Sequence, residues 1–428
     1  MKSNITLIEA PELGEKLYEF THSSGLKVQI IPKKGIYKKF AVISVGFGAV
    51  NTKFILPGQS EITTVPDGVA HFLEHKLFEQ PDGNMLERFN AAGARTNAAT
   101  GFSKTYYYFN CTENFDICFD MLMHFVTHPY ITPENVEKEK GIICREIKMY
   151  EDNPEYVSSM NLFKLLYHKN PVRKEIAGSV KSVTETTPQD LMLCYDNFYI
   201  PSNMVLTVVG DLETEKIYDE VCRHFDGFER KECPVKYFER EPDSVVAYRS
   251  EKKMDVSRSM FAIGYKNDPS VLIGDEYLIH GLAGNILCNM LFDKSSVFFE
   301  KMYEKGLIDY SFSSDFELDR NYAAASLGGE SDNPEELLKY VNEYISETSA
   351  NGINENDFIR VKRSLLGSDI RMLAFPESIG KLFSSMYLQG IQGFDYFNVY
   401  GKITANDVRK VLERVYMREP VMSVVKPL

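Results

Sequence analysis

The sequence predicts an α+β protein that contains two homologous halves. Three observations support this fold class: strand-like runs alternate with helical stretches, a charged segment with two prolines lies near the middle of the chain, and two patterns recur in the same order in both halves. With 428 residues the chain is too long for one small domain, and its hydrophobic content of 44% is enough for a large core.

Charge and composition exclude several classes of function. The chain has 48 Lys and Arg residues against 61 Asp and Glu residues, and this net charge of −13 disfavours binding to nucleic acid or to anionic membranes. The first residues lack the apolar core of a signal peptide, and no apolar run approaches the roughly 18 residues of a membrane span. The seven scattered cysteines never form a C-x-x-C pair, so we expect reduced thiols and a cytoplasmic protein.

Hydrophobic patterns predict the elements of the first half in order. Residues 26–31 and 40–45 are predicted strands because they are short apolar runs, and residues 116–125 and 133–150 are predicted helices because their apolar residues recur at helical spacing. Strands followed by helices of this length are typical of an α+β domain.

A division of the chain is predicted at residues 229–243, which are rich in charge and contain two prolines, as is typical of a linker. The expected parts are an N-terminal half at 1–228 and a C-terminal half at 244–428. Two pairs of segments share a pattern at corresponding places, namely residues 187–209 with 404–425 and residues 131–147 with 353–370. A duplicated domain explains both pairs, and chance similarity of amphipathic helices is the alternative.

His71, Glu74 and His75 form an H-x-x-E-H motif. Residues 68–78 contain no helix breaker, so we expect a helix on which these three side chains share one face. Two imidazoles one turn apart can chelate one metal ion, and zinc accepts imidazole and carboxylate ligands. Because the other faces of this helix are apolar, the alternative is a buried histidine pair that is satisfied without a metal.

A third ligand is available on the predicted helix at 133–150. Glu139 and Glu146 lie on its apolar side, two turns apart, where carboxylates are uncommon unless a cation or a metal lies beside them. Either carboxylate therefore qualifies as a metal ligand. The alternative is an ordinary amphipathic helix whose acidic side chains reach solvent at the border of the apolar face.

The segments HFLEHKLFE and ENVEKEKGIICREI resemble the inverted zinc motif of the pitrilysin/insulinase family of metallopeptidases, the inverzincins, which include mitochondrial processing peptidase and its bacterial relatives. GARTNAATGFSKTYYYF and FFEKMYEKGLIDYSF extend the resemblance through the chain. It implies one Zn²⁺ per chain, with His71, His75 and Glu146 as ligands and Glu139 behind them. The interval from His75 to Glu146 is somewhat short for the family, so Glu151 is a further candidate.

The same resemblance implies that Glu74 is the catalytic general base. Since Glu74 shares a helical face with both histidines, it can take a proton from an activated water and return it to the leaving amine. The implied function is zinc-dependent endopeptidase, a hydrolase acting on peptides or unfolded precursor segments. The alternative is a non-catalytic assembly or peptide-binding subunit of the same family.

Residues 94–99 and 105–111 predict a hairpin around Gly101. In the family, the strand that resembles Asn97 and Ala98 is a sheet edge to which an extended peptide adds by backbone pairing. The resemblance therefore implies that these two residues bind substrate, and a hairpin that only packs is the alternative.

The second half has no H-x-x-E-H motif and carries Ser368 where the repeat has Glu146, so we expect no zinc there. The family gives this half the role of closing a clamshell around a chamber. Active members often carry an Arg and a Tyr that contact substrate. Tyr310 matches the tyrosine, but Tyr303 occupies the arginine position. This difference predicts a dimer, with a heterodimer of related chains favoured over a homodimer.

Overall fold

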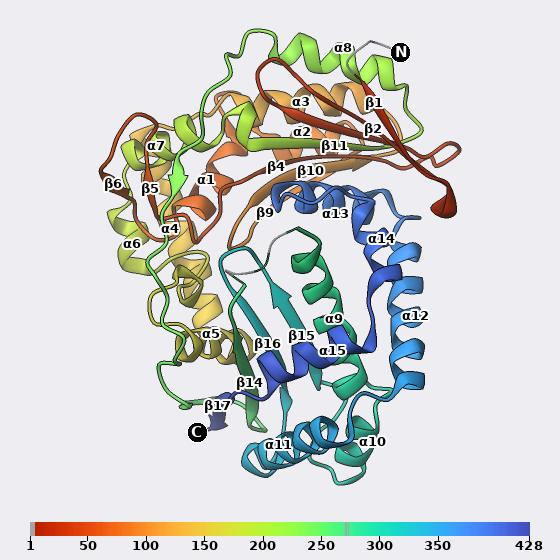
Figure 1. Ribbon diagram of the computed structural model, residues 1–428. Helices are drawn as coiled ribbons and strands as arrows, with labels where there is room; N and C mark the ends of the chain where they lie inside the picture. The colour runs from red at the N-terminus through yellow and green to blue at the C-terminus, as the bar shows by residue number, and fades with distance from the viewer. Residues whose placement is uncertain (1–4, 270–271, 273) are drawn as a thin grey trace. The chain divides into compact units, whose positions relative to one another are not determined.

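The computed structural model describes residues 5–269, 272 and 274–428, which form two compact units, each described here by itself (Figure 1). Unit 1 comprises the described parts of Met1–Ile147, Glu175–Tyr237 and Ile370–Phe394, and unit 2 comprises those of Lys148–Lys174, Phe238–Asp369 and Asp395–Leu428. Each unit mixes helices with a sheet, so the predicted α+β class is confirmed.

The sheet of unit 1 has seven strands in the order β1-β2-β3-β11-β4-β10-β9. In that order the strands are β1 (Thr6–Ala10), β2 (Glu15–Thr21), β3 (Lys27–Pro32), β11 (Met204–Gly210), β4 (Lys39–Val45), β10 (Thr105–Cys111) and β9 (Arg95–Thr100). Only β3 and β11 pair in parallel. The predicted strands and the hairpin around Gly101 are confirmed, and β9 lies at the edge of the sheet.

The sheet of unit 2 repeats this plan with five strands in the order β13-β17-β14-β16-β15. In that order the strands are β13 (Arg249–Met254), β17 (Val421–Pro427), β14 (Met260–Asn267), β16 (Ala323–Glu330) and β15 (Ser313–Leu318). A parallel pair is again followed by three antiparallel strands. The correspondence of strand order and direction supports the predicted duplication.

The helices are divided between the two units. Those within unit 1 are α1 (Val69–Leu77), α2 (Met85–Ala91), α3 (Phe115–Thr127), α6 (Val180–Glu185), α7 (Pro188–Phe198), α8 (Thr214–Phe225) and α13 (Pro376–Leu388). Those within unit 2 are α5 (Pro154–Leu166), α9 (Gly274–Phe292), α10 (Val297–Glu304), α11 (Pro334–Asn351), α14 (Asp395–Lys402) and α15 (Ala405–Val411). The chain passes between units within α4 (Pro133–Glu151) and α12 (Glu355–Met372).

Short strands complete unit 1, namely β5 (Lys53–Ile55) between β6 (Ile62–Thr64) and β12 (Val235–Lys236), and the pair β7 (Glu79–Gln80) and β8 (Gly83–Asn84). All seven cysteines are free thiols, as expected. In the part of the chain that the structure describes, none of the helices has the length and apolar character of a membrane span.

Each unit contains one helix from the opposite half of the sequence. Helix α13, from the second half, packs on β4 and β11 of unit 1, on the other side of that sheet from α2, α3 and α8 (Figure 1). Helix α5, from the first half, packs on β14 and β17 of unit 2. The expected boundary at residues 229–243 separates the two halves of the sequence, but each compact unit also contains a segment from the other half. Closure of the two halves into a clamshell stays a prediction.

Candidate metal centre

Helix α1 presents the H-x-x-E-H motif from a buried position. Its first turn follows Gly68, whose positive φ of 88° and close approach to the backbone of Ala177 leave no room for a side chain. Phe72 and Leu73 are fully buried in the core of unit 1. This packing fixes the helix, and His71 and His75 lie one turn apart on it with ring centroids separated by 4.6 Å.

Helix α4 brings Glu146 to both imidazoles. His71 Nε2 lies 3.7 Å from Glu146 Oε1, and His75 Nε2 lies 3.4 Å from Glu146 Oε2. One ligand atom from each of the three residues lies within 4.8 Å of the other two. A tetrahedral zinc with bonds of about 2.0 Å requires ligand separations of about 3.3 Å, so these distances need little adjustment.

Glu139 orients one of the histidines. His75 Nδ1 donates to Glu139 Oε1 at 3.0 Å, which leaves Nε2 directed at Glu146. Burial would raise the pKa of Glu139, but the hydrogen bond with His75 and the charge of Lys76 hold that pKa below its ordinary value. An ionised carboxylate behind a ligand histidine is the usual support of a zinc site.

The titration behaviour of the two histidines fits a cation between them. Burial and the proximity of His75 lower the pKa of His71 to about 4, so the His71 imidazole is neutral and can donate an electron pair. Burial would also lower the pKa of His75, but hydrogen bonds to Glu139 and Glu146 outweigh it and raise that pKa to about 9. The carboxylates that attract a proton there would also attract a metal ion. The donor set of two imidazoles and one carboxylate fits zinc.

Glu74 lies beside this centre and is held by the hairpin of β9 and β10. Thr100 Oγ1 donates to Glu74 Oε2 at 2.6 Å. Burial raises the pKa of Glu74, and the hydrogen bond from Thr100 partly opposes this effect. A carboxylate with a raised pKa is a better proton acceptor near neutral pH than an exposed one.

The sequence did not point to two polar residues near the centre. Thr100 ends a strand and has no distinctive spacing, so only the fold relates it to Glu74. Lys76 is fully buried on α1, where its ammonium contacts Glu79 and donates to the carbonyl of Asn135 at 3.3 Å. The predicted apolar character of the helix therefore needs this correction: a paired lysine interrupts it.

A cavity of about 720 Å³ opens beside Glu74 and His75. Its apolar lining includes Phe78, Leu86 and Ile142. The remaining lining residues are Glu79, Gln80, Pro81, Gly83, Asn84, Asn97, Tyr130, Lys138 and Glu139. A space of this size next to the metal ligands can hold side chains of a bound peptide.

Edge strand β9 borders the same cavity through Asn97. Asn97 is exposed and Ala98 is buried, and the Ala98 N–H donates to Asn97 Oδ1 at 2.9 Å. The Asn97 side chain therefore covers the backbone N–H of Ala98. When that side chain moves away, the N–H is available to pair with the backbone of a peptide.

The remaining candidate residues lie elsewhere. Glu151 is exposed at the end of α4 and does not join the cluster of His71, His75 and Glu146. Ser368 is exposed on α12. Tyr303 and Tyr310 lie in unit 2, where both rings are partly exposed and their centroids are 5.1 Å apart.

Comparison with known proteins bears on this arrangement. The family model described as insulinase, peptidase family M16, matches residues 62–180, and the model of the M16 inactive domain matches residues 185–365. The chain is 36% identical to the uncharacterized zinc protease YmfH of Bacillus subtilis over 408 residues, which cover 95% of each chain. The chain belongs to peptidase family M16. An uncharacterized zinc protease of Rickettsia felis is less similar, 24% identical over 84% of this chain and 88% of its own.

Solved structures agree with the M16 assignment. An M16-like peptidase from Alicyclobacillus acidocaldarius superimposes with a TM-score of 0.93 at 30% identity, covering 98% of this chain and all of that one. A protease from Helicobacter pylori superimposes with a TM-score of 0.84 at 18% identity, covering 96% of this chain and all of that one. The second match shows the fold alone. In the M16 chain described here, the zinc-motif helix lies in the first matched region and Tyr303 in the region matched by the inactive-domain model.

Proposed function

We propose that this M16 chain is a zinc endopeptidase that hydrolyses peptides or unfolded precursor segments. The observation that carries the proposal is the meeting of His71, His75 and Glu146 within 4.8 Å, with the carboxylate of Glu74 held beside them by Thr100. Three protein ligands with a neighbouring general base are the arrangement of a catalytic zinc site. The names of the zinc protease relatives support the same reading.

His71, His75 and Glu146 would hold one zinc ion, and Glu139 would keep His75 oriented. When bound, zinc supplies a Lewis acid that polarises the scissile carbonyl and acidifies water. Glu74 accepts a proton from the attacking water at its carboxylate and transfers it to the nitrogen of the leaving amine.

Substrate binding is proposed along β9. An extended peptide would pair with the edge at Asn97 and Ala98, and one of its side chains would enter the cavity lined by Phe78, Leu86 and Ile142. Pairing through the backbone favours unfolded substrates of varied sequence. The seven free cysteines support action in a reducing compartment such as the cytoplasm.

Glu74→Gln tests the proposal because it preserves shape and hydrogen bonding but removes the base. We expect hydrolysis of a quenched fluorescent peptide to fall by more than ~10²-fold while zinc content and peptide binding persist. Glu87→Gln, an exposed change on α2, is the matched control and should leave the rate unchanged. Glu74→Gln activity within a few-fold of wild type would show that another group moves the proton.

Substitution of the proposed ligands tests whether they hold the metal. His71→Ala combined with His75→Ala should remove one equivalent of zinc, measured by elemental analysis of the purified chain. Glu139→Gln should weaken zinc binding roughly 10- to 100-fold without deleting the site. Unchanged zinc content in the double variant would contradict the assignment.

We further propose that full activity requires a second, related chain. Tyr303 places a neutral phenol with one donor where active relatives often carry a guanidinium, and a homodimer would repeat this deficiency. A heterodimer partner would supply the cation. The alternative, a non-catalytic subunit, is favoured if zinc is bound but neither the chain nor its co-purifying partners hydrolyse peptides in any combination.

A further inference from the structure

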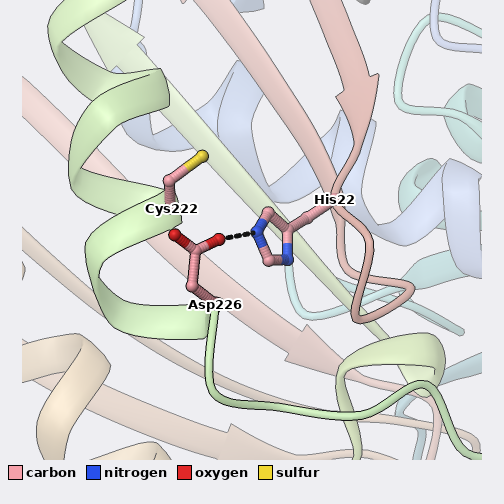
Figure 2. Close-up of side chains that lie close together, drawn as sticks. All are labelled: His22, Cys222 and Asp226. Atoms are coloured by element: carbon pink, nitrogen blue, oxygen red, sulfur yellow. Dashed lines mark hydrogen bonds and ion pairs between the residues drawn. The ribbon is translucent and has the colours of Figure 1, made fainter.

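We propose that unit 1 carries a second metal site, formed by His22, Cys222 and Asp226 and suited to a thiophilic divalent cation such as Zn²⁺ (Figure 2). His22 lies in the turn between β2 and β3, whereas Cys222 and Asp226 lie one helical turn apart at the end of α8. One ligand atom from each residue lies within 4.8 Å of the other two. None of these residues has a role in the proposed hydrolysis.

The turn holds the His22 imidazole in place. The His22 N–H donates to the Leu26 carbonyl at 2.8 Å, and the Gly25 N–H donates to the His22 carbonyl at 2.8 Å. Only 5% of the His22 side chain is exposed, and its Nε2 is directed at the carboxylate of Asp226 (Figure 2). A buried ring whose nitrogen faces one carboxylate, with a thiol sulfur within 4.8 Å, offers zinc a preformed donor.

Ser24 controls the tautomer of this ring. The Ser24 N–H lies 3.2 Å from His22 Nδ1 and donates to it, so the Nε2–H donates to Asp226 Oδ1 at 3.0 Å. Metal binding at Nε2 needs the other tautomer, in which the Ser24 N–H gives up its bond to Nδ1 and Nδ1–H donates to Ser24 Oγ, already 2.9 Å away. The His22 proton thus moves from Nε2 to Nδ1, and the Cys222 thiol releases its proton to solvent on becoming a thiolate.

The His22 and Asp226 atoms need only a small adjustment to accept zinc, and the Cys222 sulfur lies within 4.8 Å of both. A tetrahedral zinc with bonds of about 2.0 Å to nitrogen and oxygen separates these atoms by about 3.3 Å, a few tenths of an ångström more than the distance between His22 Nε2 and Asp226 Oδ1. The Asp226 side chain is 71% exposed, so it can move by this amount and leaves one side open for a water ligand. Thiolate and imidazole together favour zinc over the hard cations Mg²⁺ and Ca²⁺.

A second group of potential metal ligands differs from the proposed site because a guanidinium already neutralises its carboxylates. Asp120, Glu220 and His224 also lie within ligand distance of one another. The guanidinium of Arg223, however, contacts both carboxylates and supplies the positive charge. Among the residues that the structure describes, Asp226 forms no ion pair with Lys or Arg, and its carboxylate pairs with His22.

Cobalt absorption tests the proposal, because a thiolate ligand gives Co²⁺ a charge-transfer band that nitrogen and oxygen ligands lack. The full-length chain is stripped with a chelator and titrated with Co²⁺, and zinc content is measured separately after reloading. We expect two equivalents of metal and a thiolate band. Cys222→Ser should abolish the band and remove one equivalent without changing peptide hydrolysis. Cys233→Ser, which changes another partly buried thiol, should change neither.

Further variants separate this site from the hydrolytic centre. His71→Ala combined with His75→Ala should keep the thiolate band, and Ser24→Ala should weaken cobalt binding at the second site roughly 10- to 100-fold. His22→Gln should abolish the band while the chain remains folded by circular dichroism. Absence of a thiolate band in the wild type, or a band that persists in Cys222→Ser, would overturn the second site. Because the double histidine variant tests the hydrolytic centre alone, failure of one site leaves the other proposal intact.

Discussion

At the scale of single residues, the candidate centre depends on groups that approach α1 from other elements. Glu139 and Glu146 come from α4, and Thr100 comes from the end of β9. Two of these residues each hold one atom of the motif by a hydrogen bond: Glu139 holds His75 Nδ1, and Thr100 holds Glu74 Oε2. In the proposed function the residues of the motif would supply the reactive atoms, and these neighbours would determine where the atoms point.

Thr100→Val is expected to slow hydrolysis by misplacing Glu74. The substitution keeps the shape of the side chain but removes the donor that lies 2.6 Å from the Glu74 carboxylate. Since a hydrogen bond to a charged group is worth about 1.5–3 kcal/mol, kcat should fall roughly 10- to 100-fold with zinc content unchanged. Thr100→Ser restores the hydroxyl and should recover most of the rate. A Thr100→Val enzyme with wild-type kcat would remove this role from Thr100.

His280 is expected to make unit 2 sensitive to acid. It is buried on α9, where Asn267 Nδ2 donates to its Nε2 at 2.9 Å and the Phe316 ring lies 5.6 Å away. Burial, together with the charge of Arg414, lowers the pKa of His280 to about 4. The unfolded chain, with an ordinary histidine pKa, therefore binds more protons between about pH 6.5 and pH 4.

The free energy of unfolding is therefore unaffected by His280 above about pH 6.5. As the pH falls to about 4, protonation of this histidine in the unfolded chain lowers the free energy of unfolding by up to about 3 kcal/mol. Denaturant unfolding across this range should show a steeper loss for wild type than for His280→Gln. His128→Gln, at an exposed histidine, should behave like wild type. Parallel pH profiles of wild type and His280→Gln would contradict the assignment.

At the scale of elements, α13 packs so closely on its sheet that a glycine is required. A Cβ added to Gly380 would lie 2.6 Å from carbon atoms of the Phe40 ring, which is fully buried on β4. Unit 2 has the converse contact, since the Leu162 side chain of α5 fills the space over Gly264 on β14. Both helices therefore approach their sheets where one partner has no side chain.

Gly380→Ala is expected to destabilise the protein although alanine is the better helix former. Overpacking against a buried ring costs about 1–3 kcal/mol, which exceeds the gain of about 1 kcal/mol in helix propensity. Gly367→Ala on α12 is the control because a Cβ there meets nothing within 4 Å, and it should be neutral or stabilising. Equal denaturation midpoints for the two variants would contradict the packing argument.

The sequence predicted the elements better than their partners. The predicted helix at 133–150 is α4 at Pro133–Glu151, and the repeated pattern at 187–209 forms α7 followed by β11. Local spacing was sufficient for His71 and His75 because both lie on one helix. It could not predict the exchange of α5 and α13, since an amphipathic pattern indicates that a face is buried and not which sheet covers it.

At the scale of the whole molecule, unit 2 repeats the strand plan of unit 1 without the candidate metal ligands. Among the described residues, every group of three potential metal ligands lies in unit 1. Unit 2 carries Tyr303 on α10, stacked 5.9 Å from the Phe299 ring and 43% exposed. Tyr303 occupies the position where the resemblance to active family members predicts an arginine.

The isolated chain is therefore expected to hydrolyse a quenched fluorescent peptide about 10²- to 10³-fold more slowly than the same chain mixed with a related, co-purifying partner. Tyr303→Arg should raise the rate of the isolated chain, because a guanidinium can donate two hydrogen bonds to a substrate carbonyl. Phe299→Leu changes the neighbouring ring and should not raise it. An isolated chain that is as fast as the mixture would establish a self-sufficient peptidase.

The exchange of α5 and α13 also affects the order in which the protein can fold during its synthesis. The sheet of unit 1 is complete once residue 210 has been made, yet the helix that covers one face of it ends at Leu388 of a chain of 428 residues. A nascent chain on the ribosome therefore exposes an apolar sheet face for most of the synthesis that remains after residue 210, and such surfaces aggregate or recruit chaperones. The first half of this protein is translated early but can finish folding only when translation is nearly over.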